Sequence, residues 1–103
     1  MNRETKKMLF LSKWRMHPGK AQEAYKVFSQ LPAGDEVGDG GGKIRLIGRW
    51  HDVSGGTGVA ISECDDPQAL ALWSLNWTMM MDIEITPVVA DEEAKAIGKA
   101  MGS

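Results

Sequence analysis

The sequence predicts an α+β domain in the order β-α-β-β-α-β with one more helix at its C-terminal end. This is the ferredoxin-like arrangement of a four-stranded antiparallel sheet with helices on one face. Three observations predict it: apolar, β-favouring runs near both ends of the chain, two helical patterns between them, and a glycine-rich turn joining two strand-like runs. The length of 103 residues fits one domain, which we assign to residues 1–103.

The first strand and the first helix are separated by a clear break. Residues 8–15 form an apolar, β-favouring run that stops at the sequence His-Pro-Gly at positions 17–19. From Pro18 onward, apolar residues return at steps of three and four, which predicts an amphipathic helix ended by Pro32. Its apolar stripe consists of Ala21, Ala24, Tyr25, Phe28 and Leu31.

Two segments are predicted to be flexible. Residues 1–7 are polar and charged, and the loop over residues 32–43 holds five glycines and three acidic residues without periodicity. Neither segment carries a pattern that would bury a side chain.

A β-hairpin is predicted over residues 44–53 and 57–64, joined by Ser54, Gly55 and Gly56. If the two glycines are the turn residues, Trp50 stands opposite Ile61, Gly48 stands opposite Glu63, and Ser62 lies across from Arg49.

This register divides the hairpin into two faces, because successive side chains of a strand alternate. One face carries Ile44, Leu46, Trp50, Val59 and Ile61, joined by Glu63. The other carries Arg45, Ile47, Arg49, His51, Ala60, Ser62 and Cys64. Neither face is polar enough to be fully solvated, so we expect a second copy of the chain to cover the face that the helices leave open.

The second helix is predicted to start at Asp65-Asp66-Pro67, where a carboxylate can cap free backbone amides. An apolar stripe follows that combines the two indoles Trp73 and Trp77 with Ala69, Leu70, Leu72, Leu75 and either Met80 or Met81. Residues 82–89 alternate as the last strand, and Pro87 indicates an edge position. A short helix is predicted from Asp91 to Met101.

Composition argues against several partner classes. Twelve basic and fourteen acidic residues give a net charge of −2 without a basic cluster, which argues against nucleic-acid binding. The one cysteine, Cys64, excludes an intrachain disulfide and favours a reducing compartment. The apolar run after the charged start is too short for a signal peptide or a membrane span, so we expect a cytoplasmic protein without membrane contact.

Several strings along the chain, read together, carry a family resemblance. They are Gly-Arg-Trp-His-Asp at 48–52, Gly-Gly-Thr-Gly at 55–58, Glu-Cys-Asp-Asp-Pro at 63–67, the pair Trp73 and Trp77, and Asp-Ile-Glu-Ile-Thr-Pro-Val at 82–88. Because it contains these strings, the sequence resembles a family of small, mostly bacterial domains, the family called domain of unknown function 3303. The resemblance spans roughly residues 8 to 98, so nearly the whole of a single domain.

The resemblance implies a dimeric α/β-barrel, in which the ferredoxin-like sheets of two copies face one another. It implies no established activity. The wider superfamily includes small cofactor-independent monooxygenases, haem-degrading enzymes and stress-induced binding domains, so the fold by itself does not decide the function.

Three polar residues are candidates for catalysis: His51, Arg49 and Glu63. A histidine titrates near neutrality, and Arg49 shares its face, so the two could transfer a proton or bind an anion. Asp52 follows His51 in an extended strand, so it should point to the other face and form no dyad with it. A carboxylate at Glu63 beside apolar neighbours could act as a base if its pKa were raised. The alternatives are a hydrogen-bonded dimer rim for the first two residues and a salt bridge to an arginine for Glu63.

Four tryptophans, Trp14, Trp50, Trp73 and Trp77, are a large aromatic content for a chain of this length. They could line a pocket for a flat aromatic molecule, or they could form the core and seat the second helix on the sheet. The glycine-rich loop lacks the spacing of a P-loop, His17 and His51 are far apart, and Cys64 has no companion, so we expect neither cofactor nor metal.

Three functional hypotheses remain at this point. The first is a homodimer that binds a small apolar or aromatic molecule in a helix–sheet cleft lined by the four tryptophans. The second is a cofactor-independent enzyme, resembling a monooxygenase or an isomerase, that uses His51, Arg49 or Glu63. The third is a purely structural dimer.

Overall fold

The computed structural model describes residues 8–31 and 43–102 and has the predicted β-α-β-β-α-β order with an added helix. The sheet order is β2-β3-β1-β4 with all neighbours antiparallel, so the ferredoxin-like α+β prediction is confirmed. The elements are β1 (Met8–Met16), α1 (Ala21–Ser29), β2 (Ile44–Asp52), β3 (Thr57–Cys64), α2 (Pro67–Leu75), β4 (Met81–Val88) and α3 (Asp91–Gly102). The segments predicted to be flexible, 1–7 and 32–43, lie outside the described residues except for the exposed Lys43.

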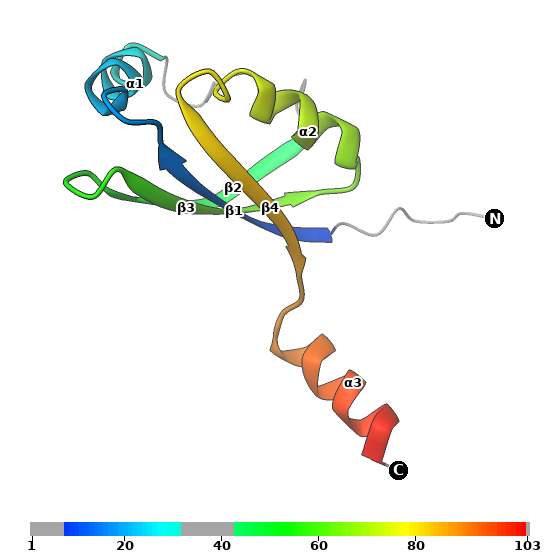
Figure 1. Ribbon diagram of the computed structural model, residues 1–103. Coiled ribbons are helices and arrows are strands. Elements are labelled where there is room, and N and C mark those ends of the chain that lie inside the picture. The colour runs from blue at the N-terminus through cyan, green and yellow to red at the C-terminus, as the bar shows by residue number, and fades with distance from the viewer. Residues whose placement is uncertain (1–7, 32–42, 103) are drawn as a thin grey trace.

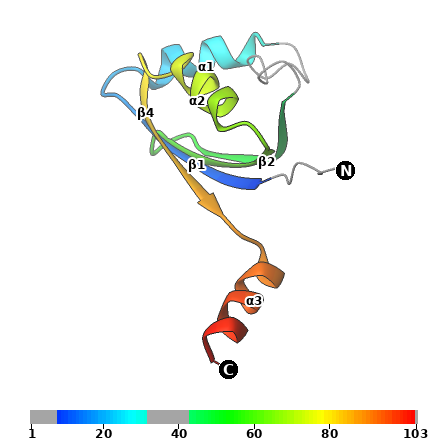
Figure 2. The ribbon, with the colours of Figure 1, turned by 90° about the vertical axis from the view of Figure 1, so that its right-hand side faces the viewer.

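The molecule has two layers and an arm. Helices α1 and α2 cover one face of the sheet, and α3 extends away on the opposite side, beyond the end of β4 (Figures 1 and 2). The uncovered side of the sheet, which we call the open face, holds a half-buried apolar set. Its members are Leu9, Leu11, Val59, Ile61 and Val88.

Local sequence signals explain how the elements begin and end. The Asp66 side chain accepts a hydrogen bond of 3.0 Å from the backbone N–H of Gln68, and Pro67 occupies the first turn of α2, as predicted. Pro87 lies in β4, which is an edge strand. No strand pairs with the outer side of β4, so the N–H that proline lacks costs no hydrogen bond between strands there.

The predicted hairpin register was wrong. Trp50 pairs with Val59 and Gly48 with Ile61, because the connection runs from Val53 to Gly56 rather than through two glycines alone. Asp52 closes this longer turn by accepting a 3.0 Å hydrogen bond from the Gly55 backbone N–H. The slip is two residues, which preserves the alternation of faces near the turn.

A β-bulge between Leu46 and Gly48 changes the faces further from the turn. Beyond it, Ile44 pairs with Cys64 and Leu46 pairs with Ser62, so both lie on the helix-covered face rather than beside Trp50 as predicted. Nearer the turn, the two-residue slip alone places Arg49 opposite Ala60 instead of Ser62. On the far side of the bulge, Arg45 pairs with Glu63 and moves to the open face. The extra residue of the bulge reverses the alternation of β2 relative to β3.

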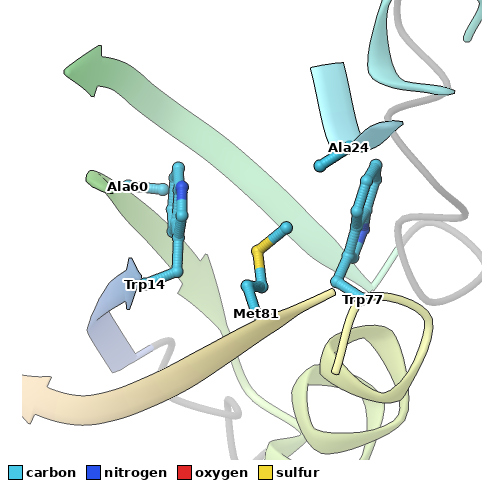
Figure 3. Packing of buried hydrophobic residues seen from close by; sticks show 5 residues of the cluster. All are labelled: Trp14, Ala24, Ala60, Trp77 and Met81. Atoms are coloured by element: carbon cyan, nitrogen blue, oxygen red, sulfur yellow. The ribbon is translucent and has the colours of Figure 1, made fainter. Parts of the chain in front are cut away.

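The core lies between the helices and the sheet. In one part of it, Met81 lies between the indoles of Trp14 and Trp77, with Ala24 of α1 and Ala60 of β3 beside them (Figure 3). A second cluster surrounds the fully buried Cys64 and consists of Phe10, Cys64, Ala69 and Leu70. The predicted α2 stripe was too wide, because Leu72 and Leu75 are 64% and 65% exposed.

We expect a chain ending at Ala90 to keep its fold, because none of the α3 residues from Asp91 to Gly102 is buried. The midpoint of thermal unfolding, followed by circular dichroism, should change by less than the roughly 4 °C that 1 kcal/mol produces in a small domain. Leu70→Ala, which empties a core position, is the contrasting control and should cost about 2–5 kcal/mol. A truncated chain as unstable as that control would mean that α3 packs against another surface.

Candidate functional site

A cleft opens between the helix layer and the sheet, on the side of α1. Strands β1, β2 and β4, helices α1 and α2, and the turn before β4 all contribute to its wall. The lining is aromatic and apolar apart from one polar corner. The lining residues are Trp14, Met16, Ala24, Tyr25, Phe28, Arg49, His51, Trp73, Trp77, Met81 and Ile83.

Three of the four tryptophans converge on this cleft from distant parts of the chain. Trp14 comes from β1, where its indole lies over the backbone of Gly58, and a side chain at Gly58 would overlap the ring. Trp73 comes from α2, and Trp77 comes from the turn that leads into β4. Trp50 does not join them, since it is 59% exposed and its indole lies over Gly48 on the open face.

The enclosed space of the cleft is small, about 40 Å³. One water-sized probe occupies roughly 10–15 Å³, so this space matches a few water molecules, whereas a benzene-sized cavity is about 150 Å³. An aromatic molecule would therefore have to lie in the open mouth of the cleft or displace half-buried lining side chains such as Phe28 and Trp73.

The polar corner is formed by three residues of α1 and β2 at the mouth. The Tyr25 hydroxyl lies 3.4 Å from His51 Nδ1, a long and weak hydrogen bond. The Arg49 guanidinium lies over the Phe28 ring, with its central carbon 4.8 Å from the ring centroid. Arg49 and His51 point to the same side because they are two residues apart in β2.

Aromatic rings surround the His51 imidazole on several sides. Its centroid lies 5.2 Å from that of Phe28, 5.6 Å from that of Tyr25 and 5.8 Å from that of Trp14. The residue is nevertheless exposed at the rim, so one side of the ring remains in contact with solvent. This arrangement holds the imidazole in place and leaves it accessible to a ligand.

The environment of this corner keeps both titratable rings uncharged near neutral pH. Partial burial lowers the pKa of His51 below its ordinary value, and the neighbouring Arg49 cation lowers it further. Partial burial raises the pKa of the Tyr25 phenol, and the negative charge of Asp52 adds to this effect. When the phenol donates its proton to Nδ1, the neutral imidazole carries its own proton on Nε2.

Glu63 lies away from the cleft, on the open face. Its Oε1 atom is 3.0 Å from Nη1 of Arg45, which is the salt bridge that the sequence left open as an alternative. Trp50 lines a second, open depression of about 890 Å³ together with charged residues such as Lys13 and Glu84. Trp14, His51 and Ile83 border both this depression and the cleft. Of the predicted site residues, the structure thus brings together Trp14, Trp73, Trp77, Arg49 and His51.

Sequence reasoning did not assign Tyr25 and Phe28 to the site, although both were placed on the apolar stripe of the first helix. The signal that could have identified them is their position four and seven residues after Ala21, on the stripe that must face the sheet. Their contact with His51 depends on where α1 crosses β2, which no local pattern contains.

Among residues 8–31 and 43–102, no group of three or more His, Cys, Asp and Glu side chains is placed to hold a metal ion. No helix in these ranges is long and apolar enough to cross a membrane.

Comparisons with known proteins agree with the fold. A family model described as Domain of unknown function (DUF3303) matches residues 8–102. The crystal structure of PA3566 from Pseudomonas aeruginosa is similar with a TM-score of 0.50 and 14% sequence identity, covering 85% of this chain and 98% of that chain. At this identity the likeness concerns the fold alone. No protein of curated function matches the sequence.

Proposed function

Because the chain belongs to this family of domains of unknown function, we propose a role from the site itself: it binds a small apolar or aromatic molecule in the helix–sheet cleft. The observation that carries this proposal is the convergence of Trp14, Trp73 and Trp77 on one open cleft that also has a polar corner. Ligand sites of this kind combine apolar walls with a few polar groups that orient the molecule.

The cleft differs from an ordinary core in two respects. It opens at the surface, and it contains a cation and an imidazole, groups that a core usually excludes. The flat indole and phenyl surfaces could contact an aromatic ring edge to face, a geometry that adds about 0.5–1.5 kcal/mol to the area that is buried.

The four indole N–H signals in a ¹H–¹⁵N NMR spectrum provide the test. On titration with benzamide, we expect the signals of Trp14, Trp73 and Trp77 to shift, while that of Trp50 stays in place because its ring lies on the open face. Trp73→Leu should weaken binding about fivefold, the loss of one aromatic contact of roughly 1 kcal/mol. Trp50→Leu is the matched control and should leave the affinity unchanged.

Two outcomes would contradict the binding proposal. In the first, small aromatic molecules at millimolar concentration leave all four indole signals unmoved. In the second, they shift the Trp50 signal as strongly as the others. The first result would favour the purely structural dimer, and the second would place the contact with the molecule on the open face, outside the cleft.

We further propose that a second copy of the chain covers the open face. Leu11 and Ile61 are neighbours in register at its centre, beside Gly48, and both are only half-buried by the chain's own atoms. Pairing this face with the same face of a second copy would remove these side chains from water. A chain of this size gains stability from such pairing, because it buries a smaller fraction of its surface on folding than a larger domain does.

The enzyme hypothesis is retained as a second candidate on one observation. His51 is uncharged near neutral pH and accessible at the rim, and when its Nδ1–H donates to the Tyr25 oxygen, its Nε2 atom can accept a proton from a bound molecule. Glu63 has no part in this version because its carboxylate lies on the other face of the sheet.

A further inference from the structure

We infer that helix α3 is an arm that binds a second copy of the chain: in the proposed dimer, α3 of each copy packs its apolar stripe against the other copy. The stripe consists of Ala94, Ile97 and Met101, which follow one another at steps of three and four residues. This inference rests on the proposed dimer, since it assigns a further contact between the same two copies. It is carried by the exposure and the position of α3 and by the limited size of the open face.

Within its own chain, α3 contributes nothing to the core. None of its residues from Asp91 to Gly102 is buried, and Ile97 and Met101 are 54% and 82% exposed. A helix of 12 residues without tertiary contacts is only marginally stable in water, and Gly98 in its interior weakens it further. Lys95 lies on the side of the helix opposite Ile97, so α3 has one apolar and one polar side. Such a helix is stabilised when another surface covers its apolar side.

The position of α3 indicates which surface this is. Helix α3 follows β4 and extends away from the sheet on the side opposite α1 and α2, which is the side of the open face (Figures 1 and 2). At 1.5 Å per residue α3 is about 18 Å long, whereas two packed sheets lie about 10 Å apart. A second copy on the open face is therefore within reach of α3, and α3 is long enough to extend past the sheet of that copy.

The open face by itself is small for a stable dimer. Its four strands of eight or nine residues, about 4.8 Å apart, cover a flat area of roughly 500 Å². A typical stable interface buries about 800 Å² on each partner. The end of the face near the hairpin turn is also charged, with Lys13, Arg15, Asp82 and Glu84. A further contact has to supply the remaining apolar area, and α3 offers an apolar side that its own chain leaves uncovered.

The charges of α3 favour a protein surface over a lipid surface. Its first turn is acidic, with Asp91, Glu92 and Glu93, and two lysines follow. Helices that lie on membranes are usually rich in Lys and Arg on the polar side, because membrane surfaces are anionic. A net negative helix is therefore poorly suited to a membrane, whereas a second copy of the chain requires no excess of positive charge.

Two matched substitutions in α3 test this inference. Ile97→Gln should weaken the dimer at least tenfold, because each of the two arms loses the burial of an apolar side chain. Lys95→Gln introduces the same residue in the same helix, on the polar side, and should leave the dissociation constant within about twofold. Sedimentation of the full chain over a range of concentrations measures both constants. Ile97 is exposed in the single chain, so its substitution leaves the fold intact.

NMR on a mixture of isotope-labelled and unlabelled chains locates the contact directly. We expect nuclear Overhauser effects between the methyl groups of Ile97 and Met101 in one copy and protons of the other copy. Near the dissociation constant, association adds little to the stability of each chain, so a chain ending at Ala90 should lose self-association and keep its unfolding midpoint. Overhauser effects from these methyl groups that stay within one chain would overturn the inference.

The sedimentation results separate this inference from the proposed dimer. If the native protein has the mass of one chain at micromolar concentration, the dimer proposal and this inference fail together. If the native protein is a dimer and Ile97→Gln weakens it no more than Lys95→Gln does, the inference is overturned and the dimer stands. Binding of the native chain to phosphatidylglycerol vesicles that Ile97→Gln abolishes, with the dimer unchanged, would likewise overturn it and assign the stripe to lipid.

Discussion

Gly58→Ala is expected to destabilise the domain by about 1–3 kcal/mol, a large effect for the addition of one methyl group. A β-carbon at Gly58 would overlap the indole of Trp14, which packs directly over this glycine. Trp14 is 8% exposed and lies against Ala60 and Met81, so its ring can move away from a new methyl group only by displacing core neighbours or filling the small cleft. The substitution should also distort the cleft, because Trp14 forms part of its wall.

Gly48→Ala is the matched control for this prediction. A β-carbon there also overlaps an indole, that of Trp50, but this ring is 59% exposed and can swing into solvent. Alanine also loses less backbone entropy than glycine on folding, so the net change should lie within about 1 kcal/mol. Urea unfolding followed by fluorescence measures both variants. Equal stability of the two variants would show that the packing of Trp14 over Gly58 does not limit this position.

The second large effect is expected at the open face. Ile61→Lys should weaken self-association by about a hundredfold or more, because a charge buried without a partner costs several kcal/mol. Ile61 lies at the centre of the face, in register with Leu11 on one side and Gly48 on the other. Light scattering on the eluate of a sizing column should find the mass of two chains for the native protein and of one chain for the variant.

Val27→Lys is the control for this substitution. It also replaces a β-branched residue with lysine, but Val27 is 43% exposed on α1, on the layer that faces away from the open face. We expect the dimer to persist in this variant. A native chain that elutes with the mass of one chain at micromolar concentration would contradict the dimer proposal, and the open face would then be a solvated surface.

Much of the fold is predictable because its signals are local. The three- and four-residue spacing of apolar residues predicts α1, the Asp66-Pro67 pair predicts the start of α2, and Pro87 predicts an edge strand. The shared face of Arg49 and His51 also follows from strand alternation alone. The hairpin error of two residues left this result intact, since a slip by two preserves the face of every side chain.

Other features could not be predicted from residues that are close together in the sequence. The bulge between Leu46 and Gly48 has no distinct pattern in the sequence, and it moved Arg45 to the open face. Trp50 and Trp73 are both tryptophans in apolar runs, yet one is exposed and the other lines the cleft. Residue type was the same in both cases, so only the neighbours brought by the fold distinguish them.

The amino-acid sequence alone determined the order of the elements, the helix start at Asp66 and the face on which His51 lies, because each depends on residues a few positions apart. The tertiary structure decided that Trp14, Trp73 and Trp77 meet at one cleft, that Tyr25 and Phe28 contact His51, and that Glu63 lies on the opposite face with Arg45. These outcomes depend on strand register and on the crossing of helix and sheet, which are set by packing between segments that are distant in the chain.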